Sequence, residues 1–207
     1  MNNDFNTEAC VTSLAEALLA EKNGADRIEI CQRLETEGMT PDYYEVSELC
    51  DQLSIPVRVM IRHTETGFEA DQAVLDKMLY SISKMKHLEI EGFVFGVLKN
   101  NEIDRRFMIK LLNAANPFPV TFHKAIDLSQ HLESDIQWIN DHSLIDTILT
   151  SGGAMTAAEG VDQILRMKKL FDGEIMAGGK IMASNLEELH EKLGLNWYHG
   201  RKIVHKQ

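Results

Sequence analysis

Short apolar segments recur along the whole chain, and amphipathic stretches separate them. The eight segments are FNTEAC near residue 8, DRIEIC near 29, IPVRVMIR near 59, GFVFGV near 95, FPVTFH near 121, IDTILT near 148, GEIMAG near 176 and LNWYHG near 198. The stretches between them have helical spacing; Val46, Leu49, Cys50 and Leu53, for example, follow i, i+3, i+4, i+7. Strands that alternate with helices until eight strands are reached favour a parallel sheet closed into a (β/α)8 barrel, the TIM barrel.

An open doubly wound sheet is the alternative, but no strand segment is followed by the G-x-G-x-x-G pattern of that class. The 207 residues contain no low-complexity segment and no linker, so we expect a single domain over residues 1–207. Only RKIVHKQ follows Gly200, which predicts that the eighth outer helix is missing or reduced. The apolar flank left by that helix predicts a second subunit, and therefore a homodimer.

Charge and composition exclude several classes of partner. The net charge of −11 argues against nucleic acid and anionic membranes, although a local basic pocket for a small anion stays compatible with it. We find no run long enough to span a membrane, and MNNDFNTEAC does not resemble a secretory signal. Three cysteines do not make a disulfide scaffold in a chain of this length. We therefore expect a cytoplasmic protein with reduced thiols.

Strand alternation predicts which side chains enter the barrel. Side chains on a strand alternate between two faces, and in a barrel one face packs on the helices while the other points inward. The predicted inward side chains are Glu8, Cys10, Glu29, Cys31, Arg58, Met60, Arg62, Thr121, His123 and His199. Such an interior is unusually polar, because barrels of this type are filled mainly by branched apolar residues.

These polar groups have two interpretations. Glu8, Glu29, Arg58 and Arg62 could bind a substrate and move protons at the barrel mouth, or they could form an internal ion-pair network. His123 ends the fifth strand segment and suits proton transfer. Lys124, which follows it, has the wrong parity to face inward and is predicted to be solvated.

Glycine-rich loops follow the sixth and seventh strand segments. They are TSGG, which includes Ser151 and Gly152, and AGGK, which includes Gly178 and Gly179. Such loops allow the backbone to approach an anion closely, and phosphate often binds near the last strands of these barrels. The alternative is a pair of plain tight turns between strand and helix.

Several segments taken together resemble the CutC family, the proteins named for copper homeostasis. They are NGADRIEIC, EGMTP, IPVRVMIR, GFVFGVL, PVTFHKAID, ILTSGG and IMAGGKI. The resemblance implies a TIM barrel, a cytoplasmic location and a connection with copper. It places Cys10 and Cys31 at the positions proposed to bind copper(I), and Glu8, Glu29, Arg62, His123 and Asp127 at family motif positions. The chain departs from the family pattern in RHTETGF (62–68) and in Lys124, where the family has arginine.

Two functional hypotheses follow. In the first, the protein binds copper(I) through Cys10 and Cys31 and serves copper homeostasis, with His123 or Met60 as a possible third ligand. In the second, it is a barrel enzyme, a lyase or isomerase acting on an anionic or sugar-like small molecule. The groups assigned to catalysis in the second hypothesis are Glu8, Glu29, His123 and Asp127. Those assigned to binding the anion are Arg58, Arg62, Ser151, Gly152, Gly178, Gly179 and His199.

Overall fold

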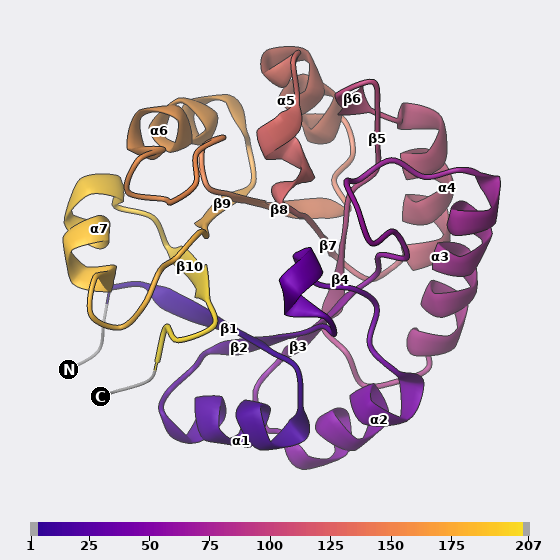
Figure 1. The fold of residues 1–207 in the computed structure, drawn as a ribbon, viewed down its shortest axis with the longest axis horizontal. Helices are drawn as coiled ribbons and strands as arrows, with labels where there is room; N and C mark the ends of the chain where they lie inside the picture. Colours follow the sequence, from indigo (N-terminus) through magenta and orange to yellow (C-terminus); the bar gives the residue numbers. More distant parts are fainter. Residues whose placement is uncertain (1–3, 205–207) are drawn as a thin grey trace.

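The computed structural model describes residues 4–204 and shows a closed barrel of eight parallel strands (Figure 1). The strands follow one another around the barrel in the order β1-β10-β9-β8-β7-β4-β3-β2. Their bounds are β1 Asn6–Val11, β2 Arg27–Ile30, β3 Val57–Met60, β4 Gly92–Phe95, β7 Val120–Phe122, β8 Ile145–Thr150, β9 Glu174–Ala177 and β10 Trp197–Gly200. The predicted TIM barrel is therefore confirmed, and each of the eight apolar segments contributes one strand.

Seven α-helices form the outer ring in Figure 1. They are α1 Leu14–Lys22, α2 Tyr43–Gln52, α3 Gln72–Met85, α4 Arg105–Ala115, α5 Leu132–Asn140, α6 Val161–Leu170 and α7 Leu186–Leu193. A small antiparallel hairpin of β5 (Leu98–Lys99) and β6 (Glu102–Ile103) precedes α4. Two short 3-10 helices, η1 (Leu34–Thr36) and η2 (Lys124–Leu128), lie in the connections after β2 and β7.

The apolar core lies between the barrel and the helices. Ile28, Val59, Phe93 and Val120 point outward from their strands and are fully buried against the helical layer. Helix α1 begins at a capped position, because the Ser13 side chain accepts a hydrogen bond from the backbone N–H of Glu16. The period-two pattern of the strands therefore directs apolar side chains outward and leaves the polar ones for the lumen.

No helix follows β10 in the part of the chain that the structure describes, as the sequence predicted. The neighbouring flank is covered from within the chain. The ring of Phe5 packs at 5.4 Å from that of Tyr198 and at 4.6 Å from that of His190 on α7, and Ala9 and Tyr198 are fully buried. Leu18 and Leu19 on the neighbouring helix α1 stay partly exposed, and the homodimer stays a prediction.

The carboxyl ends of the strands meet at one face of the barrel, which is the face seen in Figure 1. The 3-10 helix η1 lies over this mouth. None of the helices within residues 4–204 is long and apolar enough to cross a membrane.

Candidate functional site

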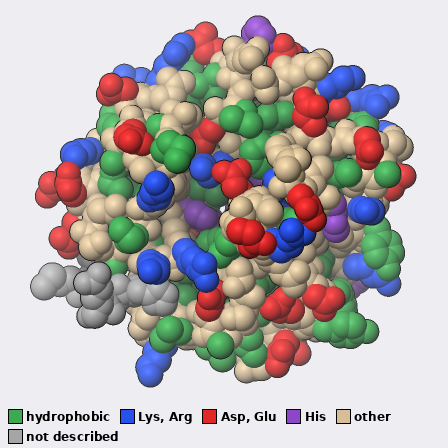
Figure 2. All heavy atoms as spheres, viewed as in Figure 1, with side chains coloured by type: hydrophobic (Ala, Val, Ile, Leu, Met, Phe, Trp, Pro, Cys, Tyr) green, Lys and Arg blue, Asp and Glu red, His purple; other side chains and the backbone are tan. Residues whose placement is uncertain are grey.

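A cavity of about 300 Å³ opens at the mouth of the barrel. Figure 2 shows a hollow at the centre of this face, with basic side chains around it and a histidine side chain inside it. The cavity is lined by Cys10, Glu29, Leu34, Glu37, Met60, Phe68, His123, Lys124, Leu149, Gly179, Lys180, His199, Gly200 and Arg201. Of the predicted site residues, the cavity therefore brings together Cys10, Glu29, His123, Gly179 and His199.

Two buried thiols lie side by side at one side of the mouth, and one of them, that of Cys10, lines the cavity. The Sγ atoms of Cys10 and Cys31 are 3.6 Å apart, because both residues point inward from the ends of the adjacent strands β1 and β2. Cys10, Cys31, Met60 and Val94 form a small apolar cluster that is separate from the main core. The hydrogen bond with Cys31, together with burial and the nearby charge of Glu29, raises the pKa of the Cys10 thiol well above its ordinary value.

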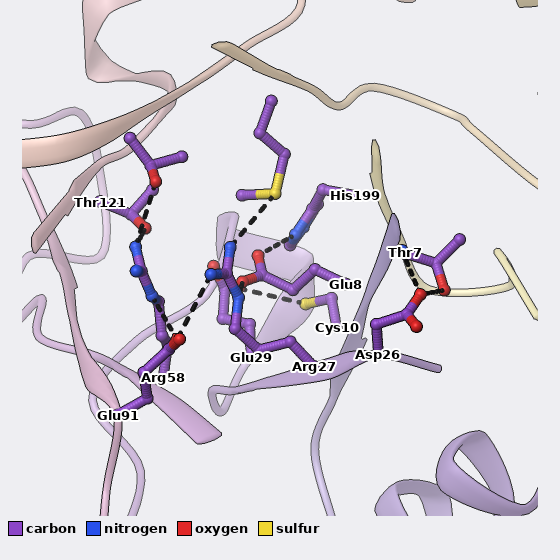
Figure 3. A network of polar contacts seen from close by, with 12 residues as sticks. Thr7, Glu8, Cys10, Asp26, Arg27, Glu29, Arg58, Glu91, Thr121 and His199 are labelled. Atoms are coloured by element: carbon purple, nitrogen blue, oxygen red, sulfur yellow. Dashed lines mark hydrogen bonds and ion pairs between the residues drawn. The ribbon is translucent and has the colours of Figure 1, made fainter. Parts of the chain in front are cut away.

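Beneath the thiols, Glu8 joins three strands through its carboxylate (Figure 3). Its Oε2 accepts a hydrogen bond from Arg27 Nε at 2.6 Å, and its Oε1 accepts one from His199 Nδ1 at 2.8 Å. Although burial alone would raise it, the charge of Arg27 and the bond to His199 lower the pKa of Glu8 to about 2. Glu8 is therefore an ionised anchor for its two neighbours.

The imidazole of His199 is oriented by this contact. Its Nδ1 donates to Glu8, so Nε2 is the ring nitrogen left for a ligand. Although burial lowers it, the charge of Glu29 and the hydrogen bond to Glu8 raise the pKa of His199 above its ordinary value. A carboxylate that accepts from one nitrogen of a histidine is the common support of a metal-binding histidine.

Cys10, Glu29 and His199 each offer one donor atom within 4.8 Å of the others, which is close enough for a shared metal ion. Glu29 Oε1 lies 3.4 Å from the Cys10 sulfur, while its Oε2 is buried without a hydrogen-bond partner among the described residues. Burial raises the pKa of Glu29. A buried carboxylate oxygen without a partner carries a desolvation cost that a ligand would relieve.

His123 occupies the opposite wall. Its strand, β7, is four places from β1 in the closed order of eight strands, so His123 and Cys10 face each other across the mouth. The ring accepts a hydrogen bond at Nδ1 from the backbone N–H of Ala125, at 3.3 Å. Burial and the charge of Arg62 lower the pKa of His123 to about 3. His199, which we predicted to bind an anion, is therefore the histidine beside the thiols. His123, which we considered as a third copper ligand, lies on the other side of the mouth.

Arg58 does not belong to the mouth, which corrects the predicted anion-binding role. Its guanidinium donates to Glu91 at 2.8 Å and to the hydroxyl of Thr121 (Figure 3). It also donates to Asp146 at 2.7 and 2.9 Å. Burial opposes the charge of Arg58, but the contacts with Asp146 raise its pKa further. Arg58 and Arg27 both bind Glu91, so together they fill the amino end of the lumen as an ion-pair network.

Asp127 also has a structural role, because its carboxylate binds the loop after β8. Its carboxylate accepts hydrogen bonds from the Thr150 hydroxyl, from Ser151 through both N–H and Oγ at 2.9 Å, and from the Gly153 N–H at 3.0 Å. The TSGG loop thus does bind an anion with its backbone, but that anion is the chain's own Asp127. This leaves neither Asp127 for catalysis nor the amide of Ser151 for a ligand, and Gly152 donates its N–H to the Thr150 hydroxyl.

Arg62 connects two loops instead of facing a ligand. It donates to the carbonyl oxygens of Thr36 and Gly38 after β2, and to that of Gly67 after β3. Burial lowers the pKa of Arg62.

In the second glycine loop, Gly178 donates its N–H to the Thr150 carbonyl, and a side chain at this position would meet Leu149 at 2.7 Å and His199 at 3.5 Å.

Sequence reasoning missed Arg27, Lys180 and Glu37, and it misjudged the burial of Lys124. Arg27 shares the inward face of β2 with Glu29, two residues away, so strand parity could have found it. Lys180 directly follows the AGGK glycines, and Lys124 is half-buried and lines the cavity, where we expected a fully solvated side chain. Glu37, also on the cavity wall, lies in an irregular connection that carries no periodic signal.

The comparisons with known proteins agree with this architecture. The family model described as "CutC family" matches residues 5–204. This chain belongs to the CutC family. A family protein CutC of Aliivibrio fischeri is 36% identical over 197 residues, which is 93% of this chain and 79% of that protein. A "Copper homeostasis protein cutC homolog" of Homo sapiens is 34% identical over 95% of this chain and 73% of its own length.

A solved CutC structure has the same fold. The putative copper homeostasis protein CutC of Streptococcus agalactiae superposes with a TM-score of 0.91 at 27% sequence identity. The match covers 96% of this chain and 99% of the other. The membership therefore extends over the whole barrel, including all strands that carry the site.

Proposed function

We propose that this CutC family chain binds copper(I) through Cys10 and Cys31 and serves copper homeostasis in the cytoplasm. The observation that carries the proposal is the pair of buried sulfur atoms 3.6 Å apart, of which that of Cys10 belongs to a residue that lines the mouth cavity. Thiolates are the soft ligands that copper(I) prefers. The name of the human relative, "Copper homeostasis protein cutC homolog", supports the role in copper homeostasis.

The sulfur separation favours a site with more than two ligands. With metal–sulfur bonds of about 2.3 Å, two sulfur atoms 3.6 Å apart subtend an angle of about 100° at a shared ion. That angle is far from linear and leaves coordination positions open on the cavity side. His199 and Glu29 are the groups placed to fill them, because both offer a donor atom close to the Cys10 sulfur.

The test is copper(I) retention under anaerobic conditions in competition with a colorimetric chelator. We expect about one ion per chain in the parent protein and loss of retention in Cys10→Ser/Cys31→Ser. Cys50→Ser is the matched control, because Cys50 is also a free cysteine but lies on helix α2, away from the pair of Cys10 and Cys31. Equal retention in the double variant and in the parent would refute the proposal.

The alternative function, a lyase or isomerase, retains part of its support. Glu8 and Asp127 have their carboxylates saturated by structural contacts, so the catalytic set shrinks to Glu29 and His123 on opposite walls. The observation that still favours a small-molecule ligand is that Glu29 Oε2 and His123 Nε2 are both buried without a partner among the described residues. A screen for turnover that is lost in Glu29→Gln would test the enzyme.

A further inference from the structure

Copper binding at the thiol wall leaves the opposite wall of the cavity without a role. His123 is 3% exposed, and its Nδ1 accepts the Ala125 N–H, which assigns the ring proton to Nε2. Within residues 4–204, that Nε2 is buried and has no hydrogen-bond partner. A buried donor left unpaired costs about 1–3 kcal/mol. An acceptor atom supplied by a ligand would remove this cost.

The imidazole is a neutral donor. Burial, with the nearby charge of Arg62, lowers the pKa of His123 to about 3, so the ring carries no charge near neutral pH. Phe68 packs on the ring with centroids 4.8 Å apart and lines the same cavity. A neutral N–H beside an aromatic wall suits a carbonyl or carboxylate oxygen on a small organic molecule.

Cationic side chains also line the cavity. Lys124 follows His123 directly, and Lys180 lies in the loop after β9, midway between β7 and β1 in the barrel order. Both line the cavity, and neither has an ion-pair partner among the described residues. Arg201 is also on the lining but is paired with Glu16 at 3.1 Å. Figure 2 shows basic side chains around the hollow, although the chain has a net charge of −11.

The acidic groups of the cavity are on the other side. Glu37 lies in the connection after β2, and Glu29 on β2 itself, next to the thiols. The cavity therefore has a sulfur-and-carboxylate wall formed by β1 and β2, and a histidine-and-lysine wall formed by the ends of β7 and β9. An anion is attracted to the second wall and repelled by the first.

We propose that the histidine-and-lysine wall binds a small organic anion, with an oxygen of the ligand accepting from His123 Nε2–H and its charged group between Lys124 and Lys180. The volume of about 300 Å³ is at the lower end for small-molecule sites and sets the ligand at a few carbon atoms with one carboxylate or phosphate. This binding goes beyond the proposed copper function and does not depend on it, because no atom of Cys10 or Cys31 is involved.

The test uses 2-phosphoglycolate as the probe, titrated into copper-free full-length protein by isothermal calorimetry. We expect saturable binding that weakens at least tenfold in His123→Leu and in Lys180→Gln. His123→Gln keeps an N–H donor and is expected to retain most of the affinity. His131→Gln, an exposed histidine outside the cavity, is the matched control.

Two further measurements separate this proposal from the copper site. Cys10→Ser/Cys31→Ser should bind the probe like the parent, and His123→Leu should retain copper(I) like the parent. Thermal melts establish whether each variant is folded. If His123→Leu does not fold, His123→Gln and Lys180→Gln still test the proposal. Absence of probe binding, or equal binding by parent and a folded His123→Leu, overturns the proposal. Equally tight binding of inorganic phosphate would also overturn it, because the organic part of the ligand would then contribute nothing to the affinity.

Discussion

The carboxylate of Glu8 accepts a hydrogen bond from His199 at 2.8 Å and so connects the first strand of the barrel to the last. The two residues are 191 positions apart in the chain, and β1 pairs with β10 in parallel at this point, with Glu8 opposite His199. The second oxygen of Glu8 is held by Arg27 of β2. Barrel closure and the orientation of a candidate ligand therefore depend on the same carboxylate.

Removing Arg27 tests this dependence. In Arg27→Met, Glu8 keeps its charge in a fully buried position with only His199 as partner, and breaking a buried ion pair costs about 3–5 kcal/mol. We expect urea denaturation to show a loss of that size in the free energy of unfolding. Arg166→Met, which breaks the exposed pair with Glu133, should cost less than about 1 kcal/mol. Similar losses in both variants would contradict the interpretation.

His123 should make stability depend on acidity. The pKa of His123 is about 3 in the folded protein and 6.5 in the unfolded chain. Between these two pH values the imidazole is protonated in the unfolded state and neutral in the folded state. The free energy of unfolding therefore loses nothing through His123 above pH 6.5, and it falls by about 1.4 kcal/mol per pH unit from pH 6.5 toward pH 3. His123→Gln removes this slope. Unfolding free energies measured across that range should show parent and variant diverging, with His131→Gln parallel to the parent.

Asp127 should hold the TSGG loop in place. Asp127→Ala removes the acceptor of the Ser151 and Gly153 amides, so both amides lose their partner and their hydrogen exchange should accelerate at least tenfold. We expect a loss of about 2 kcal/mol in the free energy of unfolding. Asp71→Ala, which removes the cap of α3 at Val74, should cost about 1 kcal/mol and leave exchange at Ser151 unchanged.

Copper(I) affinity should rise with pH. The Cys10 thiol is protonated at neutral pH because its hydrogen bond with Cys31, burial and Glu29 all raise its pKa. A metal ion must displace that proton, so the apparent dissociation constant should fall about tenfold per pH unit for each proton released. Chelator competition at several pH values gives this slope, and a pH-independent constant would exclude binding to the thiols.

Strand alternation predicted most of the side chains that enter the lumen. Glu8, Cys10, Glu29 and His123 all point inward, as their parity in the segments indicated. Alternation does not give height along the barrel axis, because that depends on the stagger between neighbouring strands. Arg58 has the right parity but lies at the amino end of β3, so it serves the ion-pair network and not the mouth.

The loops were less predictable, because a residue outside a strand has no periodic constraint. Asp127 follows β7, whereas the amides that donate to it follow β8. Arg62 donates to carbonyl groups of two different loops. In both cases the residue type was recognised but its partner was not, since backbone groups are the same in every sequence. Family resemblance located these positions without indicating that they support the loops.

The network of Arg27, Arg58, Glu91 and Asp146 has one more consequence. Because these side chains fill the amino end of the barrel, we expect an ion or metabolite to reach Cys10 or His123 across the rim beneath η1. A donor or acceptor protein that exchanges cargo directly with this barrel is then expected to dock over that rim.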